Sequence, residues 1–136
     1  MKKRLAAAIT LVALACALVP SLASAADVYE DYSKVGKVTA GSSGQWNVYA
    51  GSSKLGYVKP SYGGRWEVYE GYSKVGYVKR SYGGRWDIYS DYSKVGYVSR
   101  SSNGRWKVYA GYSQVGYVSG GSGGPAAGAA LLLLVG

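Results

Sequence analysis

The stretch Arg65-Trp66-Glu67-Val68-Tyr69-Glu70-Gly71-Tyr72-Ser73-Lys74-Val75-Gly76-Tyr77-Val78-Lys79-Arg80-Ser81-Tyr82-Gly83-Gly84 is one copy of a unit that repeats every twenty residues. Full copies lie near residues 45–64, 65–84, 85–104 and 105–119, and a partial copy near 26–44 has Ala26 where the Trp would stand. A short fixed period is typical of one supersecondary unit that buries its apolar face only against neighbouring copies. The repeat therefore decides the architecture.

Each copy has the composition of a β-hairpin. Residues 66–69 and 75–78 are short β-branched and aromatic runs, and Gly/Ser/Tyr clusters separate them. An isolated hairpin is marginal in water, so the copies are expected to associate. The sequence predicts an all-β fold over residues 26–119, a closed ring or shallow barrel of about five repeated hairpins with a short apolar helix at the C-terminus. Whether four or five hairpins form the ring stays open.

Comparison of the copies predicts the core. Two-residue periodicity places each Trp and the β-branched residue two positions later on one face, which we assign to the interior. The slot between them varies among polar residues, so it is expected to meet water. We favour a three-residue hairpin loop, 71–73, with Trp66 opposite Val78, and an indole covering each mid-strand glycine. The predicted core residues are Trp46, Trp66, Trp86, Trp106, Val48, Val68, Ile88 and Val108.

The N-terminus has the features of a signal peptide covering residues 1–25. A basic start at residues 2–4 precedes an apolar run, and Ala23-Ser24-Ala25 offers the small residues of a cleavage site. The expected location is extracytoplasmic, secreted or envelope-associated, after cleavage near Ala25. A retained membrane helix is the alternative, and lipoprotein modification at Cys16 is the weaker reading of the cleavage region.

The chain is basic, with 16 Lys and Arg against 7 Asp and Glu and a formal net charge of +9. The export signal argues against nucleic acid, so membrane lipid or an anionic envelope polymer is the expected partner. The excess charge could equally serve only to keep a Tyr-rich surface soluble. The oligomeric state stays open.

The C-terminus combines a Gly/Ser linker, residues 120–124, with an uncharged apolar segment, residues 125–136. Pro125 suits the first turn of a helix, and Ala and Leu favour helix. Twelve helical residues span about 18 Å, short of the roughly 30 Å hydrocarbon core of a bilayer. The segment can plug the ring, enter one leaflet or pair with another chain. Its most apolar residues are Leu131, Leu132, Leu133 and Leu134.

The phrases 66–69 and 74–78, Trp-Glu-Val-Tyr and Lys-Val-Gly-Tyr-Val, resemble the β-flower family of repeat proteins, especially its four-fold members. The resemblance covers residues 26–119. It implies a shallow symmetric barrel of hairpin petals around an apolar channel, similar to the tubby-type barrel with its hydrophobic central helix. It brings no settled biochemical activity.

The twenty-residue spacing also resembles choline-binding cell-wall repeats, through Gly64-Arg65-Trp66 and Gly76-Tyr77-Val78. The ligand cages of that family need a second Trp, and this chain has Tyr in that position. Tyr can still attract a cation through its ring. The four substituted positions are Tyr57, Tyr77, Tyr97 and Tyr117.

No enzyme site can be assembled from these residues, and no cofactor or metal is expected. The chain has no His, and its seven carboxylates fall at variable or tip positions of the repeat. Two recurring sets are candidate ligand or surface contacts: Arg65, Arg85 and Arg105 as a basic rim, and Tyr72, Tyr92 and Tyr112 as exposed hairpin tips. Each Arg could instead simply stack on a neighbouring Tyr or pair with an acid.

The expected function is that of a non-enzymatic exported envelope protein, associated with membrane or lipid through the apolar C-terminal segment and the basic rim. The alternative is a cell-wall or glycan-binding module related to the choline-binding type of repeat.

Overall fold

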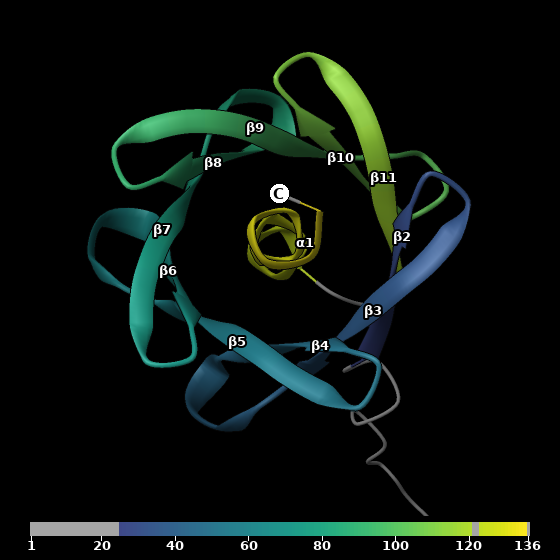
Figure 1. The fold of residues 1–136 in the computed structure, drawn as a ribbon. Helices are drawn as coiled ribbons and strands as arrows, with labels where there is room; N and C mark the ends of the chain where they lie inside the picture. Colours follow the sequence, from purple (N-terminus) through teal and green to yellow (C-terminus); the bar gives the residue numbers. More distant parts are fainter. Residues whose placement is uncertain (1–24, 121–122, 136) are drawn as a thin grey trace, which may run out of the picture.

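A computed structural model describes residues 25–120 and 123–135. Of the predicted signal peptide, only Ala25 is among the described residues. Residues 1–24, which include Cys16, lie outside them. The described chain forms a closed barrel of ten antiparallel strands around a C-terminal helix (Figure 1). The predicted all-β ring of hairpins with a short apolar helix is therefore confirmed.

Five hairpins build the barrel. Short 3-10 turns at Ser42–Gly44 (η2), Tyr62–Gly64 (η3) and Tyr82–Gly84 (η4) join some of them. The ring closes where β11 of the last hairpin pairs with β2 of the first. The partial copy thus supplies a complete hairpin, which settles the open choice in favour of five. The hairpins are β2 (Ala25–Glu30) with β3 (Ser33–Ala40), β4 (Trp46–Ala50) with β5 (Ser53–Pro60), β6 (Arg65–Glu70) with β7 (Ser73–Arg80), β8 (Trp86–Ser90) with β9 (Ser93–Arg100), and β10 (Trp106–Ala110) with β11 (Ser113–Gly120).

The register within each hairpin combines a tight loop with a bulge. Glu70 pairs with Ser73, so the loop has two residues and the prediction of a three-residue loop is wrong. The predicted pairing of Trp66 with Val78 is nevertheless confirmed. The ladder skips one residue of β7 between Val68 and Tyr69, and the same shift occurs in all five hairpins. The bulge adds the residue that the shorter loop removes.

The core consists of one ring of branched side chains on the first strands of the hairpins and a second ring on the second strands. All ten are at most 2% exposed. Of the indoles, Trp106 is 6% exposed, whereas the other three are partly exposed and pack against this core. The predicted interior is therefore confirmed for the branched residues and only in part for the Trp residues. The two rings are Val28, Val48, Val68, Ile88 and Val108, and Val38, Val58, Val78, Val98 and Val118.

The C-terminal segment runs through the centre of the barrel (Figure 1). The helix α1 (Gly124–Ala130) is buried along its whole length, and it continues into one π-helical turn, η5 (Leu131–Val135). Among the fates left open, the segment plugs the ring. Small residues fit the narrow bore: Ala126, Ala127, Ala129 and Ala130 are all 0% exposed.

The mid-strand glycines face this segment and not an indole, so the prediction of indole cover is wrong. A Cβ on Gly76 would lie 3.0 Å from Cδ1 of Leu132 and would also collide with the carbonyl oxygen of Tyr89 on the next hairpin. Glycine is therefore needed where the wall approaches both a neighbouring strand and the plug. The pairs formed between wall and plug are Gly36 with Leu134, Gly56 with Leu133, Gly76 with Leu132, and Gly96 with Leu131.

These pairs advance by one hairpin for every residue of the plug. Five hairpins around one axis are about 72° apart, whereas successive residues of an α-helix are about 100° apart. A π-helical turn closes over more residues and rotates less per residue. The wider turn at Leu131–Val135 therefore brings consecutive leucines closer to the spacing of the ring.

The last strand of the barrel ends opposite Ala26. β11 ends at Gly120, which pairs with Ala26, the one hairpin position without an indole. The helix begins beside the indole of Trp86, since a Cβ on Gly124 would collide with its ring.

Candidate functional site

The two ends of the barrel differ in chemistry. We call the end that carries the five two-residue loops the tip face, and the end that carries the connections between hairpins the base. Four loops carry a tyrosine, and the fifth has Ser52 in its place. The predicted exposure of the tip tyrosines is confirmed. Their exposed fractions are 95% for Tyr32, 99% for Tyr72, 93% for Tyr92 and 97% for Tyr112.

The tip face surrounds an apolar mouth. The chain ends here, and the side chains from Leu132 to Val135 are partly exposed. A crevice of about 500 Å³ lies between the plug and the wall, lined by Glu70, Val75, Ser90, Val95, Ala110, Leu131 and Leu132. The apolar residues near the start of the second strands, two of which line this crevice, are all partly exposed: Val35, Leu55, Val75, Val95 and Val115.

Charges on the tip face balance. Its loops and their flanking residues carry four acids and four lysines. Three of these lysines form ion pairs with acids further down the outer wall: Lys34 with Asp27 at 3.1 Å, Lys74 with Glu67 at 3.2 Å, and Lys94 with Asp87 at 3.2 Å. The eight charged tip residues are Glu30, Asp31, Glu70, Asp91, Lys34, Lys54, Lys74 and Lys94.

The base is strongly cationic. The connections at residues 39–45, 59–65, 79–85 and 99–105 contain no acid. Two further tyrosines, Tyr62 and Tyr82, are 93% exposed there. The backbone positions of the predicted rim arginines therefore belong to this end, whereas the leucines of the plug open at the other end. The base cations are Lys59, Arg65, Lys79, Arg80, Arg85, Arg100 and Arg105.

The three rim arginines lie on the outer wall, each over a tyrosine ring, which is the stacking alternative left open above. The guanidinium carbon of Arg65 is 3.8 Å from the ring centre of Tyr77, that of Arg85 is 3.9 Å from Tyr97, and that of Arg105 is 4.2 Å from Tyr117. Arg85 also lies 3.7 Å from the carboxylate of Asp87.

Tyrosine pairs cover the boundaries between neighbouring hairpins. Four boundaries carry two rings stacked face to face with centres 4.6–4.9 Å apart, and the fifth carries Lys37 over Tyr49 at 5.7 Å. Rings at this distance are in direct contact, so none of these pairs encloses a space for an ammonium group. The four pairs are Tyr29 with Tyr117, Tyr57 with Tyr69, Tyr77 with Tyr89, and Tyr97 with Tyr109.

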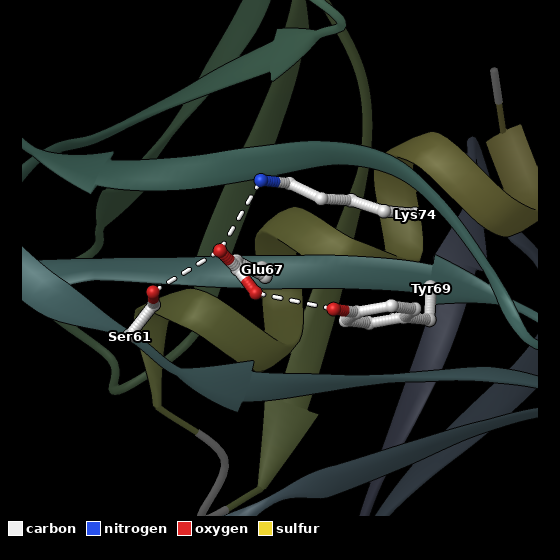
Figure 2. A network of polar contacts seen from close by, with 4 residues as sticks. All are labelled: Ser61, Glu67, Tyr69 and Lys74. Carbon is white, nitrogen blue, oxygen red and sulfur yellow. Dashed lines mark hydrogen bonds and ion pairs between the residues drawn. The ribbon is translucent and has the colours of Figure 1, made fainter.

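A polar network surrounds Glu67 on the outer wall (Figure 2). Ser61 Oγ donates to Oε2 at 3.1 Å, Tyr69 OH donates to Oε1 at 3.2 Å, and Lys74 Nζ donates to Oε2 at 3.2 Å. The Glu67 side chain is only 22% exposed, so the prediction that this slot simply meets water is wrong here.

The network shifts two pKa values in opposite directions. The hydrogen bond from Lys74, together with those from Ser61 and Tyr69, lowers the pKa of Glu67 below its usual 4.5, against the effect of burial. Burial, followed by the bond to Glu67, raises the pKa of Tyr69 above 10.0. Both shifts favour the charge states that form the hydrogen bond between the two side chains.

Within residues 25–120 and 123–135, no group of three or more acidic, Cys or His side chains could hold a metal ion. Over the same residues, no helix is long and apolar enough to cross a bilayer.

Comparison with family models, curated proteins and solved structures finds no match for this chain. Inference about function therefore rests on the two ends of the barrel. Sequence reasoning missed their separation, although the connections at residues 59–65, 79–85 and 99–105, which carry cations and no acid, contained the signal.

Proposed function

We propose that this protein is a non-enzymatic, exported envelope protein that associates with lipid through its tip face. The observation that carries the proposal is the ring of tyrosines, each at least 93% exposed, around partly exposed leucines at the end of the plug. We also propose that it is a five-hairpin relative of the β-flower proteins, on the strength of the repeat, the barrel and the apolar central helix.

The tip face suits the boundary between headgroups and hydrocarbon. Tyr rings partition to this boundary because one side is apolar and the hydroxyl stays hydrated. The residues from Leu132 to Val135 would then meet the acyl region, and their small number favours a peripheral contact over insertion.

This contact does not require anionic lipid. The tip charges balance, and the base cations lie about 15 Å away along the axis, given six-residue strands at a tilt typical of barrels. That distance exceeds the screening length of about 8 Å at physiological salt. Binding should therefore occur on neutral vesicles and change little as salt is added.

Co-sedimentation with phosphatidylcholine vesicles tests the proposal. The double change Tyr72→Ser and Tyr92→Ser should lower partitioning roughly tenfold, the equivalent of about 1.4 kcal/mol. The matched control is Tyr62→Ser with Tyr82→Ser, which removes two equally exposed rings from the base and should leave partitioning unchanged.

Equal losses in both variants, or no sedimentation of the unaltered protein, would contradict the tip-face contact. The alternative, a glycan-binding module, would be favoured if purified wall material, and not vesicles, retained the protein and the tip variant lost that retention. Exposed tyrosines suit both sugars and headgroups, so the material that retains the protein decides between the two functions, and the variants show whether the tip face makes the contact.

A further inference from the structure

We propose that the base is a binding surface for a linear polyanion whose phosphate or carboxylate groups follow an arc of seven cations. The inference deepens the envelope role proposed above and depends on it only for the source of the polymer. It rests on the distribution of charge, which is independent of the apolar tip face.

The cations form an arc and not a full ring. They lie at three consecutive boundaries between hairpins, β5/β6, β7/β8 and β9/β10. The other two boundaries carry no cation at the base: Thr39, Ala40 and Gln45 flank one, and Ser119 and Gly120, opposite Asp27 and Ala26, flank the other. An arc along one side fits a chain of negative groups better than it fits a flat surface or a single small anion.

Nothing acidic interrupts the arc within the connecting segments. The nearest carboxylates, Glu67 and Asp87, stand opposite Lys59 and Lys79 in the strand ladder, and they are also bound by Lys74 and Lys94 at 3.2 Å. Asp87 also neutralises part of the charge of Arg85. The exposed cations Lys79, Arg80 and Arg100 are therefore expected to contribute most.

Stacking prepares the rim arginines for binding. A guanidinium group that lies over a Tyr ring loses much of its freedom before a ligand arrives. Arg105 is exposed and Arg65 partly exposed, whereas Nε of Arg85 is buried, so Arg85 offers only part of its N–H edge. Such N–H edges match two oxygens of a phosphate or carboxylate. Binding then costs less side-chain entropy than it would for three freely moving lysines.

Because the tip face and the base lie at opposite ends of the barrel, the molecule can contact a lipid surface and a polyanion at the same time. With the tip face on a lipid surface, the base points away from it and can hold a polymer at a distance of about one barrel height. The protein would then join lipid to an acidic polymer without any charge contact to the lipid itself.

The test measures the affinity of the full chain for polyphosphate and for polyglutamate at several salt concentrations. The triple change Lys79→Gln, Arg80→Gln and Arg100→Gln should weaken binding at least about tenfold. It should also flatten the dependence on salt by roughly two units of log–log slope, since each neutralised charge contributes about 0.7–0.9. The control, Lys34→Gln with Lys37→Gln and Lys54→Gln, removes the same charge from the first two hairpins, away from the arc, and should weaken binding less than about twofold.

Comparison of the two polymers separates phosphate from carboxylate as the preferred group, and either one supports the proposal. Equal losses in the base and control variants would overturn it, because net charge alone would then govern binding. Displacement by inorganic phosphate at the same phosphate concentration would also overturn it. The proposal would also be overturned if the base variant bound the polymers as before but no longer bound anionic vesicles. The phosphatidylcholine assay on the tip variants tests the lipid contact separately, so its outcome does not depend on the outcome of the polymer measurements.

Discussion

Gly76 and Leu132 meet at the wall of the barrel, where a Cβ on the glycine would lie 3.0 Å from Cδ1 of the leucine. Three other hairpins repeat this contact with the three remaining leucines of the plug. This contact, together with the close approach of a carbonyl oxygen from the next strand, explains why a residue that weakens most strands recurs in the middle of these; Gly116 has the second contact alone.

Gly76→Ala should lower the free energy of unfolding by about 1–3 kcal/mol, the usual cost of overpacking. The added methyl collides with both Leu132 and the backbone of Tyr89. Chemical denaturation measures the change, and Ser52→Ala on an exposed loop serves as a control that should be near neutral. A Gly76→Ala protein as stable as the original would show that the wall can move away from the plug.

Ala127→Asp should destabilise the barrel by more than about 3 kcal/mol, because an unpaired charge would enter a dry channel at a residue that is 0% exposed. Val135→Asp places the same group at the partly exposed mouth and should cost less than about 1 kcal/mol. Thermal melting with an apolar dye separates the two. Similar melting of both variants would mean that the plug contributes little to the core.

The stability of the protein should fall in acid through Glu67. Its pKa is lower in the folded chain than the usual 4.5, so its contribution is complete above that pH and is lost as the pH falls through the folded value. Glu67→Gln should remove this part of the pH dependence, whereas Glu70→Gln at the tip is the control. An unchanged acid profile in Glu67→Gln would count against the network.

A second loss of stability is expected in alkali through Tyr69. Its pKa is raised above 10.0, so its contribution is present below pH 10 and is lost as the pH rises through the folded value. Tyr69→Phe should remove the alkaline loss, as followed by denaturation across pH 9–12. Because burial is the first cause of the shift, Glu67→Gln should leave most of it in place.

Gly71 at a hairpin tip has a φ of 62°, and the same position in two other hairpins holds Asp31 and Asp91 at 55° and 56°. Gly71→Asp should therefore cost only a few tenths of a kcal/mol, whereas Gly71→Val should cost about 1–2 kcal/mol for its left-handed backbone. Denaturant midpoints measure both. Equal effects would show that the loop can adopt another turn.

The sequence predicted the repeated hairpin, the branched core and the central helix, because each depends on local periodicity and on burial of apolar area. It also predicted the pairing of Trp66 with Val78 correctly, but it assigned three residues to the hairpin loop where the structure has two. A three-residue loop and a two-residue loop with one bulged residue give the same register, and only backbone twist selects between them.

The contacts between hairpins and between the wall and the plug could not be predicted, because they depend on how the ring of hairpins closes. The stacking of Tyr77 on Tyr89 joins two hairpins, and the contact of Gly76 with Leu132 joins the wall to the end of the chain. The number of hairpins and the direction of the plug had to be known before either contact could be assigned. For the same reason the basic rim and the apolar segment were expected to act on one surface, whereas they open at opposite ends.

The match between the four leucines of the plug and four of the five hairpins also bears on how such a protein can evolve. Near-identical repeats recombine readily, and each event would add or delete a twenty-residue copy. Because the diameter of a barrel grows with its number of strands, a sixth copy would widen the bore around the alanine helix and the loss of a copy would narrow it. The C-terminal segment thus fits only one number of repeats, and we expect lineages that gain or lose a repeat to change this segment as well.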